Sequence, residues 1–371
     1  MKRGTAPFFL ALLAAFSLLI AACGDAFDEV APPDDPDEDV IDPEPEPEPE
    51  PDEEVEEPEE VAEAQASCAD AGLDNEQATV AYMPPATEFP YYMAIEKGIE
   101  ARAEELGHET FTLAPLSDDV ETQMGMLQDV LLRDVDAVIF STHDEHSAAP
   151  LVQQIVDEGI AVVIVNSDIP DFPTPVHGVV GYVQRAGTYK LGEYTLETFG
   201  EEHKVGLIEG LPGYHSEERI GGFVDAIEDV ETMEIVASLP GGWNVEGGNE
   251  AGMDMLQANP EITMIMTAND YMSIGANAAA RALGREDVII LGNDGDTQGL
   301  EEIHAGDWEA TVMTFPFDMG EQAMQFVHDC LTGDDVPEFF HEIPTEVVDE
   351  DNAIEYLQQP ERLYPPPSQE Y

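Results

Sequence analysis

Polar side chains follow several of the apolar runs in this 371-residue chain. One run is followed by Ser141, and three others are followed by an asparagine with an aspartate close behind it. These three groups are Asn166 with Asp168, Asn269 with Asp270, and Asn293 with Asp294. If the runs are parallel strands, their carboxyl ends meet at one edge of a sheet, where ligands bind in open α/β folds. Amides and carboxylates at that edge are suited to hydrogen-bonding hydroxyl groups.

Two further residues extend this chemistry. Arg219 is one of only ten basic residues after residue 77, and Trp243 lies in a glycine-rich loop after an apolar run. A guanidinium offers a planar fork of donors, and an indole ring covers apolar C–H faces. Together with the amides and carboxylates, these two side chains predict a site for a polyhydroxylated ligand.

Three aromatic residues, Phe89, Tyr91 and Tyr92, lie where a strand-length apolar run, 80–83, leads into a helical pattern. Pro90 suits the first turn of this helix, and the glycine at 107 suits its end. At the carboxyl end of a strand, the three rings form either a surface that recognises a ligand or a plug on the core. These residues alone do not decide between the two interpretations.

Signals for metal binding and catalysis are weaker. The run HDEH at 143–146 resembles a metal cluster, but its spacing fixes no third ligand, so a solvated loop is the better interpretation. The run NDGD at 293–296 lacks the rest of a calcium-binding EF-hand loop. The chain contains no G-x-S-x-G, P-loop or G-x-G-x-x-G motif. We therefore predict no metal, no cofactor and no enzymatic activity. A pair of catalytic carboxylates is the alternative, because among so many acids some lie close together by chance.

The elements that position these residues alternate regularly along the chain. Strands are predicted at 80–83, 109–114, 135–140, 161–165, 179–182, 204–209, 234–239, 263–267, 288–292, 310–314 and 345–348. Helices are predicted at 90–106, 120–133, 147–158, 184–199, 215–227, 245–258, 272–283, 298–304 and 318–331. Runs such as AVVIV lack alternation, which is typical of parallel strands covered on both faces. The pattern predicts an α/β fold with two similar doubly wound parallel sheets.

The first 77 residues are predicted to lie outside this fold. Residues 1–22 read as an export signal, with two basic residues at its start and an apolar run too short for a membrane span. The segment LIAAC at 19–23 resembles the lipobox of bacterial lipoproteins, in which the cysteine, here Cys23, is lipidated; a plain cleaved signal is the alternative. Residues 24–77 hold 24 acids, no Lys or Arg, and a Pro-Glu repeat, which favours an extended disordered tether.

The remaining residues, 78–371, carry 57 acidic and 10 basic side chains, a net charge of −47. This charge excludes nucleic acid and anionic lipid as partners of the surface. Because the acids are spread over the whole segment, they do not indicate a cationic ligand. They indicate adaptation to high salt, which screens the repulsion between them.

Two cysteines, Cys68 and Cys330, remain besides Cys23. In an exported protein such a pair is either a disulfide or two free thiols, and the count alone does not decide.

Several motifs, in order, resemble those of the ribose-type periplasmic sugar-binding proteins. The first is F-P-Y-Y-x5-G-I-x3-A-x2-L-G at 89–107, where that family usually has N-P-F-F or N-P-F-W with the same later spacing. It is followed by R-I-G-G-F at 219–223, T-A-N-D-Y-M-S-I-G at 267–275, L-G-N-D-G at 291–295 and A-T-V-M-T-F-P at 310–316. The resemblance extends over about residues 78–350.

The resemblance implies which residues bind the ligand. The stacking rings of the first motif fall on Tyr91 and Tyr92, with Phe89 in place of the family's asparagine. The other positions implied are Ser141, Asn166, Asp168, Arg219, Trp243, Asn269, Asp294 and Thr314. An Asp-Arg pair of the family is replaced by Asn166 and its neighbour, with Asp168 as a substitute carboxylate. Because of these differences the resemblance does not identify the sugar, but it still implies a sugar as the class of ligand.

The same resemblance implies the domain plan and the role. Residues 78–181 with 315–343 would form one lobe, 182–314 with 344–360 the other, and 361–371 a loose tail. The family's topology returns the helix bearing Cys330 to the first lobe, which implies a disulfide with Cys68. The implied protein is a monomeric lipoprotein, anchored outside the cytoplasmic membrane, that delivers a sugar or polyol to the permease of an ABC transporter. A sensor feeding a chemoreceptor or kinase is the alternative, and a surface carbohydrate hydrolase is a weaker one.

Overall fold

The computed structural model describes residues 65–69, 71, 72, 77–169, 172–333 and 338–371. The predicted export signal, Cys23 and nearly all of the predicted tether lie outside the described residues. All described residues fall within one compact unit, 60–371. Within the described part of the chain, no helix is long and apolar enough to cross a membrane.

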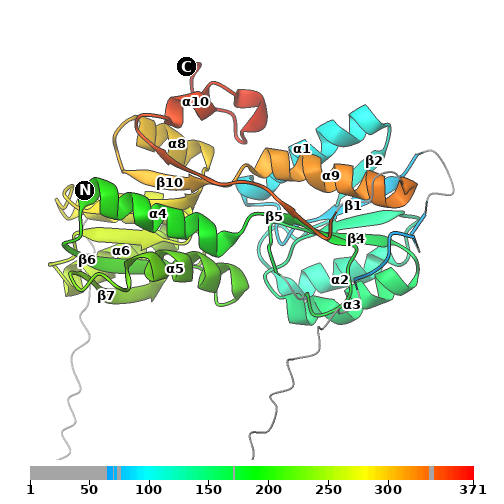
Figure 1. The fold of residues 1–371 in the computed structure, drawn as a ribbon, viewed down its shortest axis with the longest axis horizontal. Coiled ribbons are helices and arrows are strands. Elements are labelled where there is room, and N and C mark those ends of the chain that lie inside the picture. Colours follow the sequence, from blue (N-terminus) through cyan, green and yellow to red (C-terminus); the bar gives the residue numbers. More distant parts are fainter. Residues whose placement is uncertain (1–64, 70, 73–76, 170–171, 334–337) are drawn as a thin grey trace, which may run out of the picture. The chain divides into compact units, whose positions relative to one another are not determined.

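The first lobe is built on a six-stranded parallel sheet with the order β11-β5-β4-β3-β1-β2. Figure 1 labels β1, β2, β4 and β5 of this sheet. The strands are β1 (Thr79–Met83), β2 (Glu109–Thr112), β3 (Ala137–Phe140), β4 (Ala161–Val165), β5 (Gly178–Gly181) and β11 (Phe340–Glu342). One face packs against α1 (Pro90–Leu106) and α9 (Pro316–Thr332), and the other against α2 (Val120–Val130) and α3 (Glu145–Asp157). In β1, Val80 and Tyr82 pack on the first pair of helices, whereas Ala81 and Met83 pack on the second. This two-sided burial explains the apolar runs without alternation.

The second lobe repeats the plan with the order β12-β10-β9-β8-β6-β7. Its strands are β6 (His203–Glu209), β7 (Met233–Pro240), β8 (Met264–Thr267), β9 (Ile289–Asp294), β10 (Ala310–Met313) and β12 (Glu346–Asp349), with β12 antiparallel to β10. Helices α4 (Gln184–Phe199) and α5 (Tyr214–Ile227) cover one face. The other face is covered by α6 (Val245–Ala258), α7 (Asp270–Ala282), α8 (Thr297–His304) and α10 (Ala353–Leu357).

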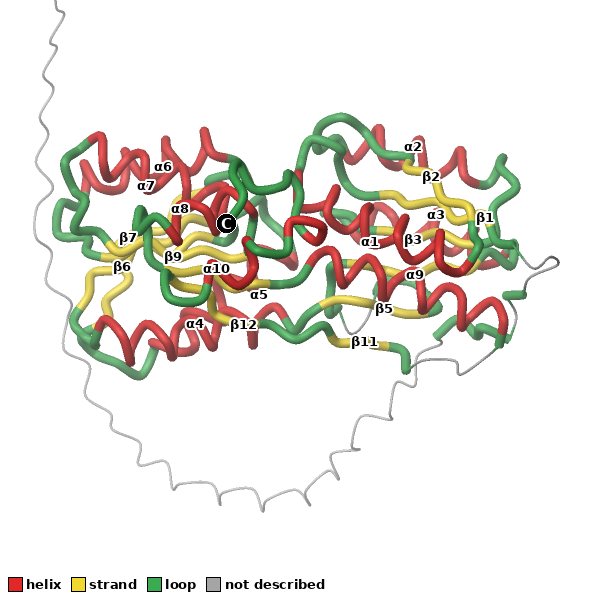
Figure 2. The backbone as a smooth tube through the Cα atoms, turned by 90° about the horizontal axis from the view of Figure 1, so that it is seen from above, coloured by secondary structure: helices red, strands yellow, loops and turns green. Residues whose placement is uncertain are grey.

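The chain passes between the two sheets at 182–183, 314–315 and 343–345. Figure 2 shows the strands in two groups, each bordered by helices. The prediction of two doubly wound, mainly parallel sheets joined by several connections is confirmed.

The short elements near the C-terminus were not predicted. They are β11, α10 and the 3-10 helix η1 (Pro360–Arg362). Residues 361–371, predicted to be a loose tail, instead make contacts with both lobes. The Leu363 carbonyl accepts a hydrogen bond from Lys97 of α1 at 2.9 Å, and the Tyr371 ring lies edge-on to His304 of α8. A proline-rich composition did not reveal these contacts, because they depend on surfaces far away in the sequence.

Helices α1 and α9 approach each other at two glycines. A Cβ built on Gly98 would lie 2.0 Å from the carbonyl oxygen of Phe317, and one on Gly320 would lie 2.0 Å from that of Ile95. Both distances are far below a van der Waals contact, so the backbones of the two helices are packed directly on each other. This contact joins the two segments of the chain that form the first lobe, because α1 belongs to the earlier segment and α9 to the later one.

We expect Gly98→Ala to destabilise the protein by about 1–3 kcal/mol, because α1 and α9 must move apart to admit the methyl group. Gly125→Ala in α2 is the matched control, since a Cβ there meets nothing within 4 Å. The control should be neutral or stabilising by about 0.5–1 kcal/mol, because alanine suits a helix better than glycine. Urea unfolding of both variants measures the difference, and equal midpoints would contradict the close packing.

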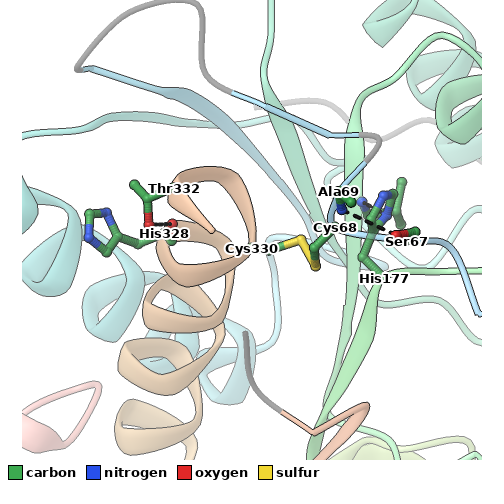
Figure 3. Close-up of a disulfide and its surroundings, with 8 residues drawn as sticks. Ser67, Cys68, Ala69, His177, His328, Cys330 and Thr332 are labelled. Carbon is green, nitrogen blue, oxygen red and sulfur yellow. Dashed lines mark hydrogen bonds between the residues drawn. A yellow bond between two sulfur atoms is a disulfide. The ribbon is translucent and has the colours of Figure 1, made fainter. Parts of the chain in front are cut away.

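A disulfide joins Cys68 to Cys330 of α9, with an S–S distance of 2.02 Å (Figure 3). Cys330 is buried in the core between α9 and the sheet, and Cys68 packs against the same cluster. The backbone N–H of Ala66 also donates to the Val176 carbonyl at 3.0 Å. These two contacts fasten the segment 65–69 to the first lobe.

The basic side chains of the two lobes are largely committed to ion pairs, as in Arg185 with Asp225 and Arg281 with Asp307. Most acids therefore have no cationic partner. We expect the unfolding midpoint to rise as KCl is increased from 0.1 to 3 M, because the screening length falls from roughly 10 Å at 0.1 M to 3 Å at 1 M. A flat or falling midpoint would contradict adaptation to high salt.

Candidate functional site

A cavity lies where the carboxyl ends of the strands of both lobes meet. It encloses about 420 Å³ of atom-free space, including its mouth. Its lining consists of Phe89, Tyr91, Tyr92, His143, Asn166, His215, Arg219, Trp243, Asn269, Tyr271 and Asp294. The lining mixes aromatic rings with a few polar groups, as the lining of small-molecule sites does.

Eight of the eleven predicted ligand-binding residues line this cavity. They are Phe89, Tyr91, Tyr92, Asn166, Arg219, Trp243, Asn269 and Asp294. The other three, Ser141, Asp168 and Thr314, are not among the lining residues; Ser141 and Thr314 are buried, and Asp168 is partly buried. Their predicted contact with a ligand stays a prediction.

Arg219 and Asp294 form a buried ion pair at the cavity. Arg219 is 4% exposed, and its Nη1 donates to Asp294 Oδ1 at 2.9 Å and to the Ala268 carbonyl at 3.1 Å. Its Nε donates to Oε1 of Gln184, the first residue of α4, at 3.0 Å. The guanidinium also lies 5.4 Å from the centre of the Trp243 ring. Held from several sides, the guanidinium is fixed in orientation before any ligand arrives.

Asp294 ends β9, and its loop is held by a second carboxylate. Asp270 accepts from the backbone N–H groups of Gly295 and Asp296 at 2.9 and 2.8 Å, and from the Thr311 hydroxyl at 2.6 Å. Burial raises the pKa of Asp294 to about 6, since removal from water disfavours the charged form, although Arg219 acts in the opposite direction. The pair therefore combines a fixed cation with a carboxylate that titrates close to neutral pH.

Unfavourable backbone conformations gather at the cavity. Among the described residues, the non-glycine residues with positive φ are Asn166 (63°), Trp243 (66°), Asp294 (134°) and Phe315 (52°). Three of these four line the cavity, and Phe315 lies in a connection between the lobes. Such conformations cost on the order of 1–3 kcal/mol each and concentrate at functional sites. Their clustering marks the cavity as a site that the fold maintains at the expense of stability.

The hydroxyl groups of Tyr91 and Tyr92 both contact polar side chains at the cavity. The Tyr91 hydroxyl donates to Asn166 Oδ1 at 3.0 Å and lies 3.0 Å from the Thr314 hydroxyl, which in turn donates to the Asp294 carbonyl. The Tyr92 hydroxyl lies 3.2 Å from Nε2 of His143. The network links side chains of both lobes at the base of the cavity.

Trp243 presents its ring from the loop between β7 and α6. Its carbonyl accepts from the Asn269 side-chain amide at 3.3 Å, and Asn269 Oδ1 caps α7 by accepting from the Met272 N–H at 3.0 Å. A Cβ on Gly210 would lie 2.0 Å from the indole, so glycine is needed there for the ring to fit. The indole is therefore held in one orientation.

Asp168 and the backbone of Ser141 are held by neighbouring glutamines, whereas the buried Ser141 hydroxyl has no hydrogen-bond partner among the described residues. The Asp168 carboxylate accepts from the backbone N–H and the side-chain amide of Gln184 at 3.1 and 3.2 Å, at the start of α4. The Ser141 carbonyl accepts from the Gln123 side chain at 2.8 Å. Asp168 thus positions Gln184, which in turn orients Arg219.

Three residues of the lining, His143, His215 and Tyr271, were not among the predicted ligand-binding residues. His143 was interpreted as part of a solvated loop, and this was wrong: its side chain is 15% exposed, and Nδ1 lies 2.9 Å from Asp118 Oδ2. His215 Nδ1 lies 3.0 Å from the Gln184 Oε1, and burial lowers its pKa well below the usual value. The Tyr271 hydroxyl donates to Asp296 at 2.8 Å. The HDEH run was the one signal that could have indicated His143.

The arrangement can bind a small neutral ligand with several hydroxyl groups. Arg219 and Asp294 supply charged donors and acceptors, the amides of Asn166 and Asn269 supply neutral ones, and the rings supply apolar faces. Within the described residues, no group of three or more His, Cys, Asp or Glu side chains is placed to hold a metal ion.

Comparisons with known proteins agree with the two-lobed fold. The family model described as "Periplasmic binding protein domain" matches residues 80–335. The D-apiose import binding protein of Actinobacillus succinogenes is 28% identical over 69% of this chain and 81% of its own length. The D-allose-binding periplasmic protein of Escherichia coli is 27% identical over 67% of this chain and 85% of its own length. A solved solute-binding protein of Actinobacillus succinogenes with bound D-allose superposes with a TM-score of 0.70 at 24% identity, covering 75% of this chain and 100% of that one.

Proposed function

The chain belongs to the periplasmic binding protein family, and on this premise we propose that it is the substrate-binding lipoprotein of an ABC-type sugar importer. Its ligand is a sugar or a sugar-like polyol, bound in the cavity between the two lobes. The relatives named above carry D-apiose or D-allose in their names. The protein acts by binding and delivery and has no catalytic role.

The observation that carries the proposal is the buried Arg219–Asp294 pair beside the Trp243 ring. A fixed guanidinium and a carboxylate can share two adjacent hydroxyl groups, while the indole covers the C–H face of the same sugar. Ser141, Asp168 and Thr314 support this lining. A bidentate contact of this kind distinguishes a hydroxyl-rich ligand from an apolar one, because leaving the buried pair without partners is costly.

The delivery route is part of the same proposal. Cys23 carries the lipid, and the lobes remain close to the outer face of the cytoplasmic membrane. The tether was predicted to extend over residues 24–77, but it ends before the segment 65–69, which is fastened to the first lobe. The permease of the transporter receives the sugar there. A single tethered copy is sufficient for this role, since the described cavity is complete within one chain.

A thermal-shift screen tests the proposal. The protein in 2 M KCl is heated with D-ribose, D-allose, D-apiose, myo-inositol, other pentoses, hexoses and polyols, and nucleosides. A ligand present at a hundred times its Kd adds about 2.7 kcal/mol to the free energy of unfolding. We expect at least one sugar to raise the midpoint and to be recovered unchanged. Stabilisation by none of them overturns the proposal, and recovery of a hydrolysed product indicates the hydrolase instead.

A further inference from the structure

The rings of His143 and Trp243 face each other across the cavity from opposite lobes. Their centroids are 6.2 Å apart, and their planes differ by 26°. His143 follows β3 in the first lobe, and Trp243 follows β7 in the second. Two nearly parallel rings on opposite walls are the geometry that covers both faces of a sugar ring.

The two tyrosines of the first motif are not arranged in this way. Tyr91 stands edge-on to Tyr92, with an angle of 89° between the rings, and both are less than a tenth exposed. Their hydroxyl groups are engaged with Asn166, Thr314 and His143. Among the described residues, neither tyrosine ring makes a ring contact with Trp243, whereas His143 does.

His143 is held in its orientation by a carboxylate and by neighbouring rings. Its Nδ1 lies 2.9 Å from Asp118 Oδ2, and its Nε2 lies 3.2 Å from the Tyr92 hydroxyl. The rings of Phe89 and His215 lie at 6.5 and 6.0 Å, tilted by 59° and 76°. The two contacts at the ring nitrogen atoms lie in the plane of the imidazole, so they fix the ring without using the face that it turns toward Trp243.

We propose that His143 is the first-lobe ring that stacks on the sugar, opposite Trp243, and that Asp118 positions it. This inference rests on the proposed function and assigns the stacking role to a residue outside the first motif. Each ring–sugar contact requires about 3.5–4 Å between heavy atoms. The two rings must therefore move apart by roughly 1–2 Å as the sugar enters, which a small movement of the lobes supplies.

Three variants test the stacking role by calorimetric titration with D-ribose and with D-allose. His143→Ala removes the ring and should weaken binding about ten- to a hundredfold. His143→Phe keeps a flat face without the nitrogen atoms and should bind within about threefold of the wild type. His146→Ala is the matched control, because His146 lies three residues away on the exposed side of α3 and should change nothing.

The outcomes separate this inference from the proposed function. Wild-type protein that binds no sugar overturns both. Wild-type binding with unchanged affinity in His143→Ala overturns the inference alone. Affinity as low in His143→Phe as in His143→Ala also overturns it, because the imidazole would then act through its hydrogen bonds rather than its face. Unfolding midpoints of the ligand-free variants confirm that the affinities refer to folded protein.

The positioning role of Asp118 has its own test. Asp118→Ala should weaken binding about five- to tenfold when His143 is present. In the His143→Phe protein, which cannot make the Nδ1 hydrogen bond, the same change should alter affinity less than twofold. Equal effects in both backgrounds would show that Asp118 acts independently of His143 and would overturn the positioning role.

Discussion

Replacing Arg219 with methionine is expected to weaken sugar binding about ten- to a hundredfold and to destabilise the ligand-free protein. A hydrogen bond from a charged donor contributes about 1.5–3 kcal/mol, which corresponds to one to two decades in Kd. The loss of stability follows because Asp294, 5% exposed, is left without its cation. Removing one partner of a buried pair costs about 3–5 kcal/mol, reduced here by the ease with which Asp294 takes up a proton.

The double variant Arg219→Met/Asp294→Asn separates binding from packing. Replacing both charges removes the uncompensated carboxylate, so stability should recover most of the loss, whereas affinity should remain low. Arg281→Met is the matched control, since the pair with Asp307 lies at the surface with half of the arginine side chain exposed. It should cost less than about 1 kcal/mol and leave Kd unchanged. Unchanged Kd in both Arg219→Met and Asp294→Asn would show that the site is assigned wrongly.

The pH dependence of binding gives a second measure of the same pair. Because Asp294 has a pKa of about 6 rather than the usual 3.8, lowering the pH through 6 should protonate it and weaken binding. The ligand-free protein should respond in the opposite direction. A pKa that is higher in the folded state means that the folded state holds the proton more tightly, so this group stabilises the fold more as pH falls from 6 toward 3.8. Calorimetry and unfolding measured between pH 7 and 5 distinguish the two trends.

The two-lobed architecture could be predicted from the sequence because it depends on long, repeated patterns of apolar residues. A strand such as β4 is buried on both faces, and five consecutive apolar residues record this directly. The short elements could not be predicted, because they are too short to show such a pattern. The three residues of β11 show no pattern, and their conformation comes from pairing with β5, more than 150 residues earlier.

The lining of the cavity could be predicted only in part, because a sequence shows where a polar residue lies along the chain but not which way its side chain points. Asn166 and Asp168 both follow β4, yet Asn166 lines the cavity while Asp168 accepts hydrogen bonds from the start of α4. His143 illustrates the converse. Its neighbours in sequence are polar, which is typical of a solvated loop, but its ring lines the cavity and is held there by Asp118 from a different loop. Loop contacts of this kind have no periodicity from which to predict them.

Removing the disulfide is expected to produce the other large effect, a loss of about 2–5 kcal/mol in the free energy of unfolding. Cys68 and Cys330 are 262 residues apart, so the bridge restrains a long stretch of the unfolded chain. In the chain-entropy model the stabilisation grows with the length of the closed loop. The oxidising environment of an exported protein allows the bridge to persist.

Cys68→Ala is the informative variant, because Cys68 is only partly buried and its truncation removes little packing, whereas Cys330 is in the core. Cys68→Ala should lower the unfolding midpoint as much as reduction of the wild type with dithiothreitol does, and the reductant should have no further effect on the variant. Mass spectrometry of the unreduced protein should find the peptides of Cys68 and Cys330 linked. Free thiols in the native protein, together with a wild-type midpoint that does not respond to reductant, would contradict the bridge. The segment 65–69 would then be held to the first lobe mainly by the hydrogen bond from Ala66 to Val176.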